Sequence, residues 1–510
     1  MRLPSRPARP ARLRQALAGA AAAVLLAGCG ASVADDTAAS TAGPSSASGS
    51  TSAVVSTDAT TVDGALADDV AVETGDTSYV EADATAVTLS GSDAESDSDA
   101  VSSSDGTVTI SAADTYVLSG DLSGQVVVDS AGDGVVRLVL DGASITSDTS
   151  AAIDVVDAGS VVVVLADGST NTLEDAATYD DTSADAPTGA LYSTADLTIG
   201  GSGSLTVTGN SNNGIVGKDG LVVTGGTIDV TSVDDGIIGK DYLVLTDGAV
   251  TVDATGDGVK SDNTEDAGAG FVLVEGGELT VSSQDDGIKG VQVLVSGGTV
   301  DVTGSTEAME GSLVIVDDGD IELHSADDGV NVASSDDSAA VDGQAGMGGM
   351  AADDSLQLYV NGGTLEVWAS GDGLDSNGSA TITGGDIVVH GPTTDGNGAL
   401  DVNGAFEVTG GTLLATGSAG MMVAPSADSA QGWIATALDT TAAAGSEVVV
   451  TDADGAEVAT YTLAKDAASV VYSAAGITDG ETYTVTVDGT AATVTAGQAP
   501  AGGHGGPMGG

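Results

Sequence analysis

The chain has 510 residues, of which 76 are acidic and 11 are basic, so its formal net charge at pH 7 is −65. This charge excludes electrostatic attraction to nucleic acid or to an anionic membrane surface, because both are polyanions. Glycine is unusually frequent, with 75 residues, aromatic residues make up only 3%, and a single cysteine excludes a disulfide within the chain.

The first 29 residues have the features of an export signal. Five arginines, from Arg2 to Arg14, precede the apolar run "ALAGAAAAVLLAG", which is too short to span a bilayer. The run ends in "LAGC", which is similar to a bacterial lipoprotein box with Cys29 as the lipidated residue. We therefore expect an extracellular protein that is anchored to the cell membrane through a lipid on Cys29.

Residues 30–103 consist largely of Ser, Ala, Thr and Asp and show little periodicity. This composition predicts a disordered tether between the lipid anchor and the folded domain.

A triplet of an acid or amide, a small residue and an apolar residue recurs through the middle of the chain. Its central positions are separated by 22, 22, 29, 21, 21, 44 and 25 residues. The triplets begin at Asn213, Asp235, Asp257, Asp286, Glu307, Asp328, Asp372 and Asn397. A glycine turn keeps the same spacing, from Gly226 to Gly411, and is flanked by the period-2 alternation of half-buried strands. The sequence therefore predicts repeats of about 22 residues, each with two or three short strands.

Such repeats predict an all-β fold, namely a parallel β-helix of about 22 residues per coil over residues 104–429. Segments 174–187 and 334–354 are expected to be loops that leave the coils. Residues 430–495 lose the spacing and show hairpin patterns, which predicts a small C-terminal β cap, and residues 496–510 are expected to be a flexible glycine-rich tail.

Several motifs resemble the carbohydrate-binding-domain proteins of bacterial surfaces, which are related in fold to pectate lyases. The motifs lie within about residues 105–420 and include "NNGIVGKDGLVVTGGTIDV", "GDGVKSDNTEDAGAGFVLVEGG", "SGDGLDSNGSATITGGDIVVHGPT" and "NGALDVNGAFEVTGG". The resemblance implies a right-handed parallel β-helix with bound calcium that binds cellulose or acidic plant cell-wall polysaccharides. "GSTEAMEG" departs from the pattern, because Glu307-Ala308 replaces Asp-Gly.

The acidic residues of successive repeats predict a metal site. Carboxylates stacked about 4.8 Å apart would repel by roughly 3–4 kcal/mol at an effective dielectric constant near 20. Calcium, which accepts six to eight oxygen ligands, is the expected counter-ion; solvated Asp-Gly corners are the alternative for any single pair. The candidate ligands are Asp234, Asp235, Asp257, Asp262, Asn263, Asp285, Asp286, Asp327, Asp328, Asp372 and Asp375.

Four lysines accompany these acids, namely Lys218, Lys240, Lys260 and Lys289. They are candidates for contact with a polysaccharide, and local neutralisation of the acids is an equal alternative. If the protein were a lyase, Lys260 and Lys289 would be the candidate catalytic bases.

An outward column five residues after the glycine turn contains His324, Trp368 and His390 in succession, provided that segment 334–354 is a loop. Stacked rings in this column would offer a flat strip to the face of a neutral sugar, whereas isolated exposed side chains are the alternative.

Three functions remain open from the sequence. The favoured one is a non-catalytic, surface-anchored, calcium-loaded module that binds polysaccharide. A calcium-dependent polysaccharide lyase of the pectate type and a structural or adhesive stalk are the alternatives. Glycan binding with and without a chelator would separate them most directly.

Overall fold

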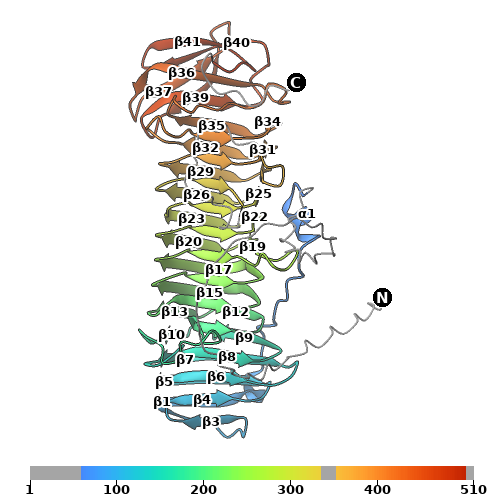
Figure 1. Ribbon diagram of the computed structural model, residues 1–510, viewed down its shortest axis with the longest axis vertical. Coiled ribbons are helices and arrows are strands. Elements are labelled where there is room, and N and C mark those ends of the chain that lie inside the picture. The colour runs from blue at the N-terminus through green and yellow to red at the C-terminus, as the bar shows by residue number, and fades with distance from the viewer. Residues whose placement is uncertain (1–58, 335–351, 501–510) are drawn as a thin grey trace, which may run out of the picture. The chain divides into compact units, whose positions relative to one another are not determined.

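The computed structural model describes residues 59–334 and 352–500 (Figure 1). The predicted signal, the lipidation site at Cys29, residues 335–351 of the predicted loop and residues 501–510 of the predicted tail lie outside this part. Among the described residues, no helix is long and apolar enough to cross a membrane. Their helical elements are α1 (Val62–Leu66) and the 3₁₀ helix η1 (Glu81–Asp83).

The strands belong to three sheets of 24, 13 and 4 strands. The 13-stranded sheet contains β3 (Val101–Ser104), β4 (Thr107–Ile110), β6 (Gln125–Asp129), β8 (Ile153–Asp157), β11 (Gly189–Ser193), β14 (Asn213–Gly217), β16 (Ile237–Gly239), β18 (Val259–Ser261), β21 (Ile288–Gly290), β24 (Met309–Gly311), β27 (Val330–Val332), β30 (Leu374–Ser376) and β33 (Leu400–Val402). The 4-stranded sheet contains β37 (Glu447–Thr451), β38 (Glu457–Thr462), β40 (Thr482–Val487) and β41 (Thr490–Thr495).

The 24-stranded sheet contains the remaining strands. They are β1 (Thr85–Gly91), β2 (Asp93–Glu95), β5 (Thr115–Ser123), β7 (Val135–Thr146), β9 (Ser160–Leu165), β10 (Thr170–Glu174), β12 (Leu197–Gly201), β13 (Ser204–Gly209), β15 (Gly220–Ser232), β17 (Tyr242–Ala254), β19 (Phe271–Val274), β20 (Glu278–Ser283), β22 (Gln292–Val295), β23 (Thr299–Gly304), β25 (Leu313–Val316), β26 (Asp320–Ser325), β28 (Gln357–Val360), β29 (Thr364–Ala369), β31 (Ser379–Ile382), β32 (Asp386–His390), β34 (Phe406–Val408), β35 (Thr412–Gly417), β36 (Trp433–Ala442) and β39 (Ala467–Ser473).

Equivalent residues of successive repeats pair in parallel, as the spacing of the triplets predicts. Ile215 pairs with Ile237, Ile237 with Val259, and Val259 with Ile288. The 44-residue interval is also bridged in register, because Val330 pairs with Leu374 across the predicted loop. These apolar residues are at most 2% exposed and belong to one continuous core, so each repeat buries its apolar side chains against its neighbours.

The prediction of a single right-handed parallel β-helix with a separate C-terminal cap is wrong. The all-β class is correct, but the strands form several sheets, and the long strands β7, β15 and β17 join two rows of pairings into the 24-stranded sheet. This sheet also includes β36 and β39 from the predicted cap, and β39 pairs antiparallel with both β35 and β36. The edge of the last repeat would otherwise expose unpaired backbone groups, which β39 satisfies.

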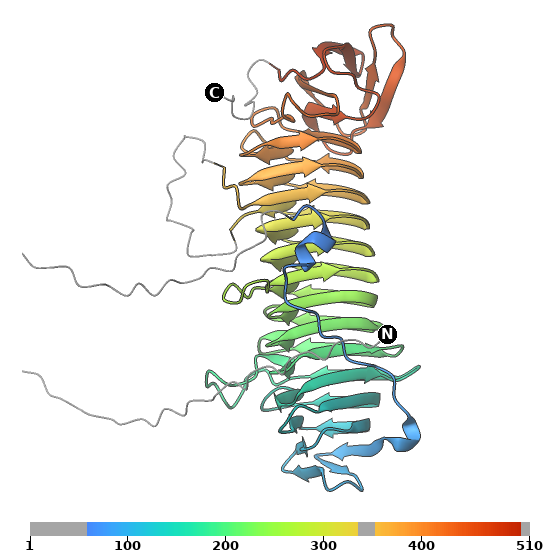
Figure 2. The ribbon, with the colours of Figure 1, turned by 90° about the vertical axis from the view of Figure 1, so that its right-hand side faces the viewer.

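Residues 30–58 of the predicted disordered tether lie outside the described part, and the prediction is wrong for residues 59–103. Residues 59–80, which we call the strap, are ordered, and η1, β1, β2 and β3 follow them. The strap begins near β25 and runs across β22, β19 and β17 toward β1 (Figure 2). Ala59, Val62 and Ala65 of the strap pack on outward apolar residues of those strands, including Tyr242 and Phe271. The burial of this apolar surface stabilises a segment whose composition alone indicates disorder.

Candidate functional site

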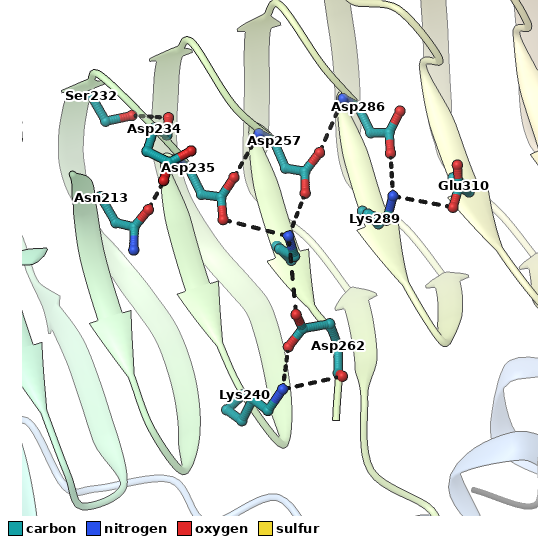
Figure 3. Close-up of polar contacts among 11 residues, drawn as sticks. Asn213, Ser232, Asp234, Asp235, Lys240, Asp257, Asp262, Asp286, Lys289 and Glu310 are labelled. Carbon is teal, nitrogen blue, oxygen red and sulfur yellow. Dashed lines mark hydrogen bonds and ion pairs between the residues drawn. The ribbon is translucent and has the colours of Figure 1, made fainter. Parts of the chain in front are cut away.

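The acids and amides that begin the triplets form a ladder of hydrogen bonds beside the 13-stranded sheet (Figure 3). Asn213 Oδ1 accepts the backbone N–H of Asp235 at 3.0 Å, and Asp235 Oδ1 accepts that of Asp257 at 2.8 Å. Asp257 Oδ1 in turn accepts the backbone N–H of Asp286 at 3.1 Å. The preceding Gly256 allows this approach, because a Cβ atom there would lie 2.5 Å from Asp235 Oδ1. Each carboxylate thus satisfies a backbone donor of the next repeat, a role that the sequence analysis did not assign.

Two lysines neutralise the first part of the ladder. Lys260 Nζ lies 2.7 Å from Asp257 Oδ2 and 3.5 Å from Asp235 Oδ2. Lys289 Nζ lies 2.8 Å from Asp286 Oδ2 and 3.3 Å from a carboxylate oxygen of the next repeat, Glu310 Oε1. Asp257 and Asp286 are each 3% exposed, so removal of either lysine would leave a buried charge without its counter-ion.

These ion pairs also fix the protonation of both lysines. Burial by itself would lower the pKa of Lys260, but Asp257 and Asp235 outweigh burial and the pKa rises. Burial would likewise lower the pKa of Lys289. Asp286 and Glu310 outweigh burial, so the pKa of Lys289 rises as well. A general base must first lose its proton, so the surroundings of both lysines oppose that role.

The ladder continues without lysines farther along the chain. Asp328 Oδ1 accepts the backbone N–H of Asp372 at 2.6 Å, and Asp372 Oδ1 accepts that of Gly398 at 2.5 Å. The register position of Lys260 and Lys289 is taken successively by Glu310, Asn331, Asp375 and Asp401. Acidic residues therefore replace the basic ones in this part of the sheet.

Burial raises the pKa of three aspartates in this part of the sheet: Asp328 to about 6, Asp372 to about 7 and Asp375 to about 8. Mutual repulsion among these carboxylates and that of Asp401 raises the values further. We call Asp328, Asp372, Asp375 and Asp401 the acidic cluster. Its chemistry fits an oxygen-seeking cation, since carboxylates are the preferred ligands of calcium.

Two further groups of carboxylates converge near the lysines. Two groups, Asp257 with Asp285 and Asp286, and Asp286 with Glu307 and Glu310, bring carboxylate oxygens within 4.8 Å of one another. Both groups include carboxylates that already pair with Lys260 or Lys289. Burial and the neighbouring Glu310 raise the pKa of Glu307, which favours its neutral form and weakens it as a ligand.

The remaining predicted ligands have other surroundings. Asp262 pairs with Lys240 at 2.6 Å, and the Asn263 side-chain amide donates to Asp241 and Asp266, which organises the loop that follows β18. Asp234 and Asp327 are exposed.

The four predicted lysines lie at different positions relative to the ladder. Lys260 pairs in register with Lys289, whereas Lys240 follows β16 and Lys218 is an exposed residue after β14. Only Lys260 and Lys289 lie among the ladder carboxylates.

The predicted row of rings is present on the 24-stranded sheet. His324 pairs in register with Trp368, and Trp368 with His390. The ring centroids of His324 and Trp368 are 5.5 Å apart with an interplanar angle of 8°, and those of Trp368 and His390 are 4.2 Å apart at 43°. His390 is only 7% exposed, so His324 and Trp368 provide most of the accessible ring surface.

A shallow cavity of about 560 Å³, widely open to solvent, adjoins this row, where a register shift after Val281 pairs Ser282 with Gly304. Its lining is Ser282, Ser283, Gly304, Ser305, His324, Ser325, Ala326, Trp368, Ser370 and Lys465. Lys465 was not among the predicted residues, because it lies outside the repeats and reaches the cavity only through tertiary contacts. An aromatic face beside several hydroxyl groups is the composition expected for a pocket that binds a polar organic ligand.

Comparison with known proteins places the repeats in a family. Residues 104–396 match the family model described as carbohydrate-binding domain-containing protein. A carbohydrate-binding domain-containing protein of Acetivibrio thermocellus is 45% identical over 197 residues, which cover 38% of this chain and 69% of that protein. The chain belongs to this carbohydrate-binding-domain family.

A solved structure is also similar to part of the chain. It is described as the polysaccharide lyase-like protein from C. thermocellum, gadolinium derivative, with a TM-score of 0.43 and 34% sequence identity over 45% of this chain and 96% of that one. The residues of the present chain that match the family model include the ring row and most of the acidic ladder, but they end before Asp401 and Lys465.

Proposed function

We propose that this member of the carbohydrate-binding-domain family binds a polysaccharide without cleaving it. The sugar ring lies against His324 and Trp368, and its hydroxyl groups enter the adjoining cavity, where serine side chains provide hydrogen-bond partners. The observation that carries the proposal is the in-register ring row at the edge of a cavity of about 560 Å³.

We further propose that calcium binds the acidic cluster. Asp328, Asp372, Asp375 and Asp401 would supply carboxylate oxygens, and the ion would supply the positive charge that lysines supply in the earlier repeats. This role is structural, because the cation relieves repulsion among stacked carboxylates. The lysine-paired ladder between Asp235 and Glu310 has less need of an ion.

The proposal of sugar binding is tested by titration calorimetry with a soluble neutral β-glucan oligosaccharide. Trp368→Ala removes the larger ring and is expected to weaken binding at least about tenfold. Gly304→Phe tests the cavity, since a Cβ atom at Gly304 meets no atom within 4 Å and a larger side chain enters open space. We expect this variant to weaken binding without loss of folding.

Trp368→Phe, which keeps an aromatic face, should retain most of the affinity. Thr231→Ala, a change in the same outward column several repeats away, should leave it unchanged. Binding by Trp368→Ala and Gly304→Phe with the affinity of the unaltered protein would refute the proposed site.

A further inference from the structure

Lys465 lies in the turn between β38 and β39, far in sequence from the other residues of the cavity. Its Nζ donates hydrogen bonds to the backbone carbonyl of Ala369 at 2.5 Å and to that of His390 at 3.1 Å. Ala369 directly follows Trp368, and His390 is the last residue of β32. One ammonium group therefore links the C-terminal region to β29 and β32, two of the three strands that carry the rings.

The charge of Lys465 is unusual in its surroundings. The cavity lining contains no aspartate or glutamate, although the chain has 76 acidic residues. Among the described residues, Lys465 forms no ion pair, and its two hydrogen bonds are with neutral carbonyl oxygens. An ammonium group has three donors, so one N–H remains for an acceptor in the cavity.

The electrostatics of the cavity therefore differ from those of the ladder. Lys260 and Lys289 are neutralised by carboxylates at 2.7 and 2.8 Å, whereas the positive charge of Lys465 faces a space bordered by hydroxyl groups, a histidine and an indole. A partly buried cation without a counter-ion attracts an anionic ligand group, and partial desolvation strengthens that attraction.

We propose that Lys465 is a specificity-determining residue of the cavity and favours a sugar that carries a carboxylate over its neutral counterpart. This inference rests on the proposed function, because the sugar must first lie on Trp368. The carboxylate receives a charge-assisted hydrogen bond from Nζ while the ring stacks on the indole. The C-terminal region thereby becomes part of the binding site, although it lies outside the residues that match the family model.

The test compares two oligosaccharides of the same linkage and length, one neutral and one with a uronate in place of each hexose. In calcium-free buffer of low ionic strength, Lys465→Met should weaken binding of the uronate about tenfold and that of the neutral sugar less than about twofold. Lys465→Arg keeps the charge and should preserve the preference. Added salt should reduce the preference of the unaltered protein but not that of Lys465→Met.

Gln498→Glu is the matched control, because it makes the same change of net charge at an exposed site outside the cavity lining. It should leave both affinities unchanged. Equal weakening of both sugars by Lys465→Met would reduce Lys465 to a positioning residue and overturn the inference, as would an unchanged preference. Failure of Trp368→Ala to affect either sugar would instead refute the proposed site, so the two proposals fail in different ways.

Discussion

Asp69 and Gln292 join the strap to β22 through an incomplete pair of hydrogen bonds. Gln292 Nε2 donates to Asp69 Oδ1 at 2.7 Å, while Asp69 Oδ2 and Gln292 Oε1 are buried without a hydrogen-bond partner. Burial raises the pKa of Asp69 to about 6, and the charge of neighbouring Asp68 contributes. The neighbouring loop of residues 263–270, whose Gly268 carbonyl accepts the backbone N–H of Val70, also contains the acidic residues Glu265 and Asp266. A protonated Asp69 would provide the donor that Gln292 Oε1 lacks.

Asp69→Asn tests this interpretation, because an amide supplies that donor at every pH. The pKa of Asp69 is higher in the folded protein than its ordinary value of 3.8, so the folded state favours the proton. The contribution of the protonated pair is complete below about pH 4 and is lost as the pH rises through about 6.

Thermal unfolding should therefore show Asp69→Asn to be more stable than the unaltered protein by about 1 kcal/mol at pH 8 and equal to it at pH 4. Asp68→Asn serves as the control for removal of one negative charge from the strap. An equal gain for Asp68→Asn and Asp69→Asn would contradict a specific role of the pair.

Along the 13-stranded sheet, the stacked carboxylates have different neighbours in two stretches. Between β16 and β24, lysines on the strands neutralise the ladder, whereas between β27 and β33 the corresponding strand positions are occupied by Asn331, Asp375 and Asp401. Under the proposal that calcium binds the acidic cluster, we expect the second stretch, but not the first, to depend on an added ion.

Calcium should raise the midpoint of thermal unfolding, because an ion that binds only the folded protein stabilises it by mass action. The double variant Asp372→Asn and Asp375→Asn should be more stable than the unaltered protein in excess chelator and should gain less from calcium. Asp234→Asn, at an exposed position, should keep the full calcium response. Equal midpoints in calcium and in chelator for the unaltered protein would exclude a stabilising calcium site.

The parts of the structure that depend on the repeat could be predicted from the sequence. The 22-residue spacing placed Ile215 opposite Ile237, and the prediction of a loop over residues 334–354 placed His324 beside Trp368. The contacts of Asp69 and Lys465 could not be predicted, because each joins segments that are far apart and outside the repeat. The predicted separate cap failed for a related reason: alternation identifies β39 as a strand but not the edge of β35 as its partner.

Carboxyl groups buried on folding give the whole molecule an unusual dependence on pH. Burial raises the pKa of Asp154 and Asp328 to about 6, Asp286 and Asp372 to about 7, and Asp375 to about 8, all from 3.8. The folded protein thus binds more protons than the unfolded chain between about pH 4 and pH 8. We therefore expect its free energy of unfolding to fall as the pH rises across that interval, with a smaller opposite contribution from His390, whose pKa burial lowers.

Urea unfolding in chelator at pH 5, 6, 7 and 8 measures this decline directly. We expect a steady fall, and a smaller one in the Asp372→Asn and Asp375→Asn double variant, which lacks two of these groups. A free energy of unfolding that rises from pH 5 to pH 8 would contradict the raised pKa values of these buried carboxyl groups.

The strap changes how the stacked repeats can come apart. A chain of repeats that touch only their neighbours can lose its end units one at a time. In the strap, Val62 N donates to Asp317, Glu73 N to Tyr242, and Gly75 N to Thr198. One short segment is therefore bonded to β12, to β17 and to the turn after β25. Unfolding of any repeat beneath the strap must stretch or release a tie to distant repeats. The strap therefore links repeats along the length of the stack, couples their local unfolding, and makes the unfolding of the whole stack more cooperative.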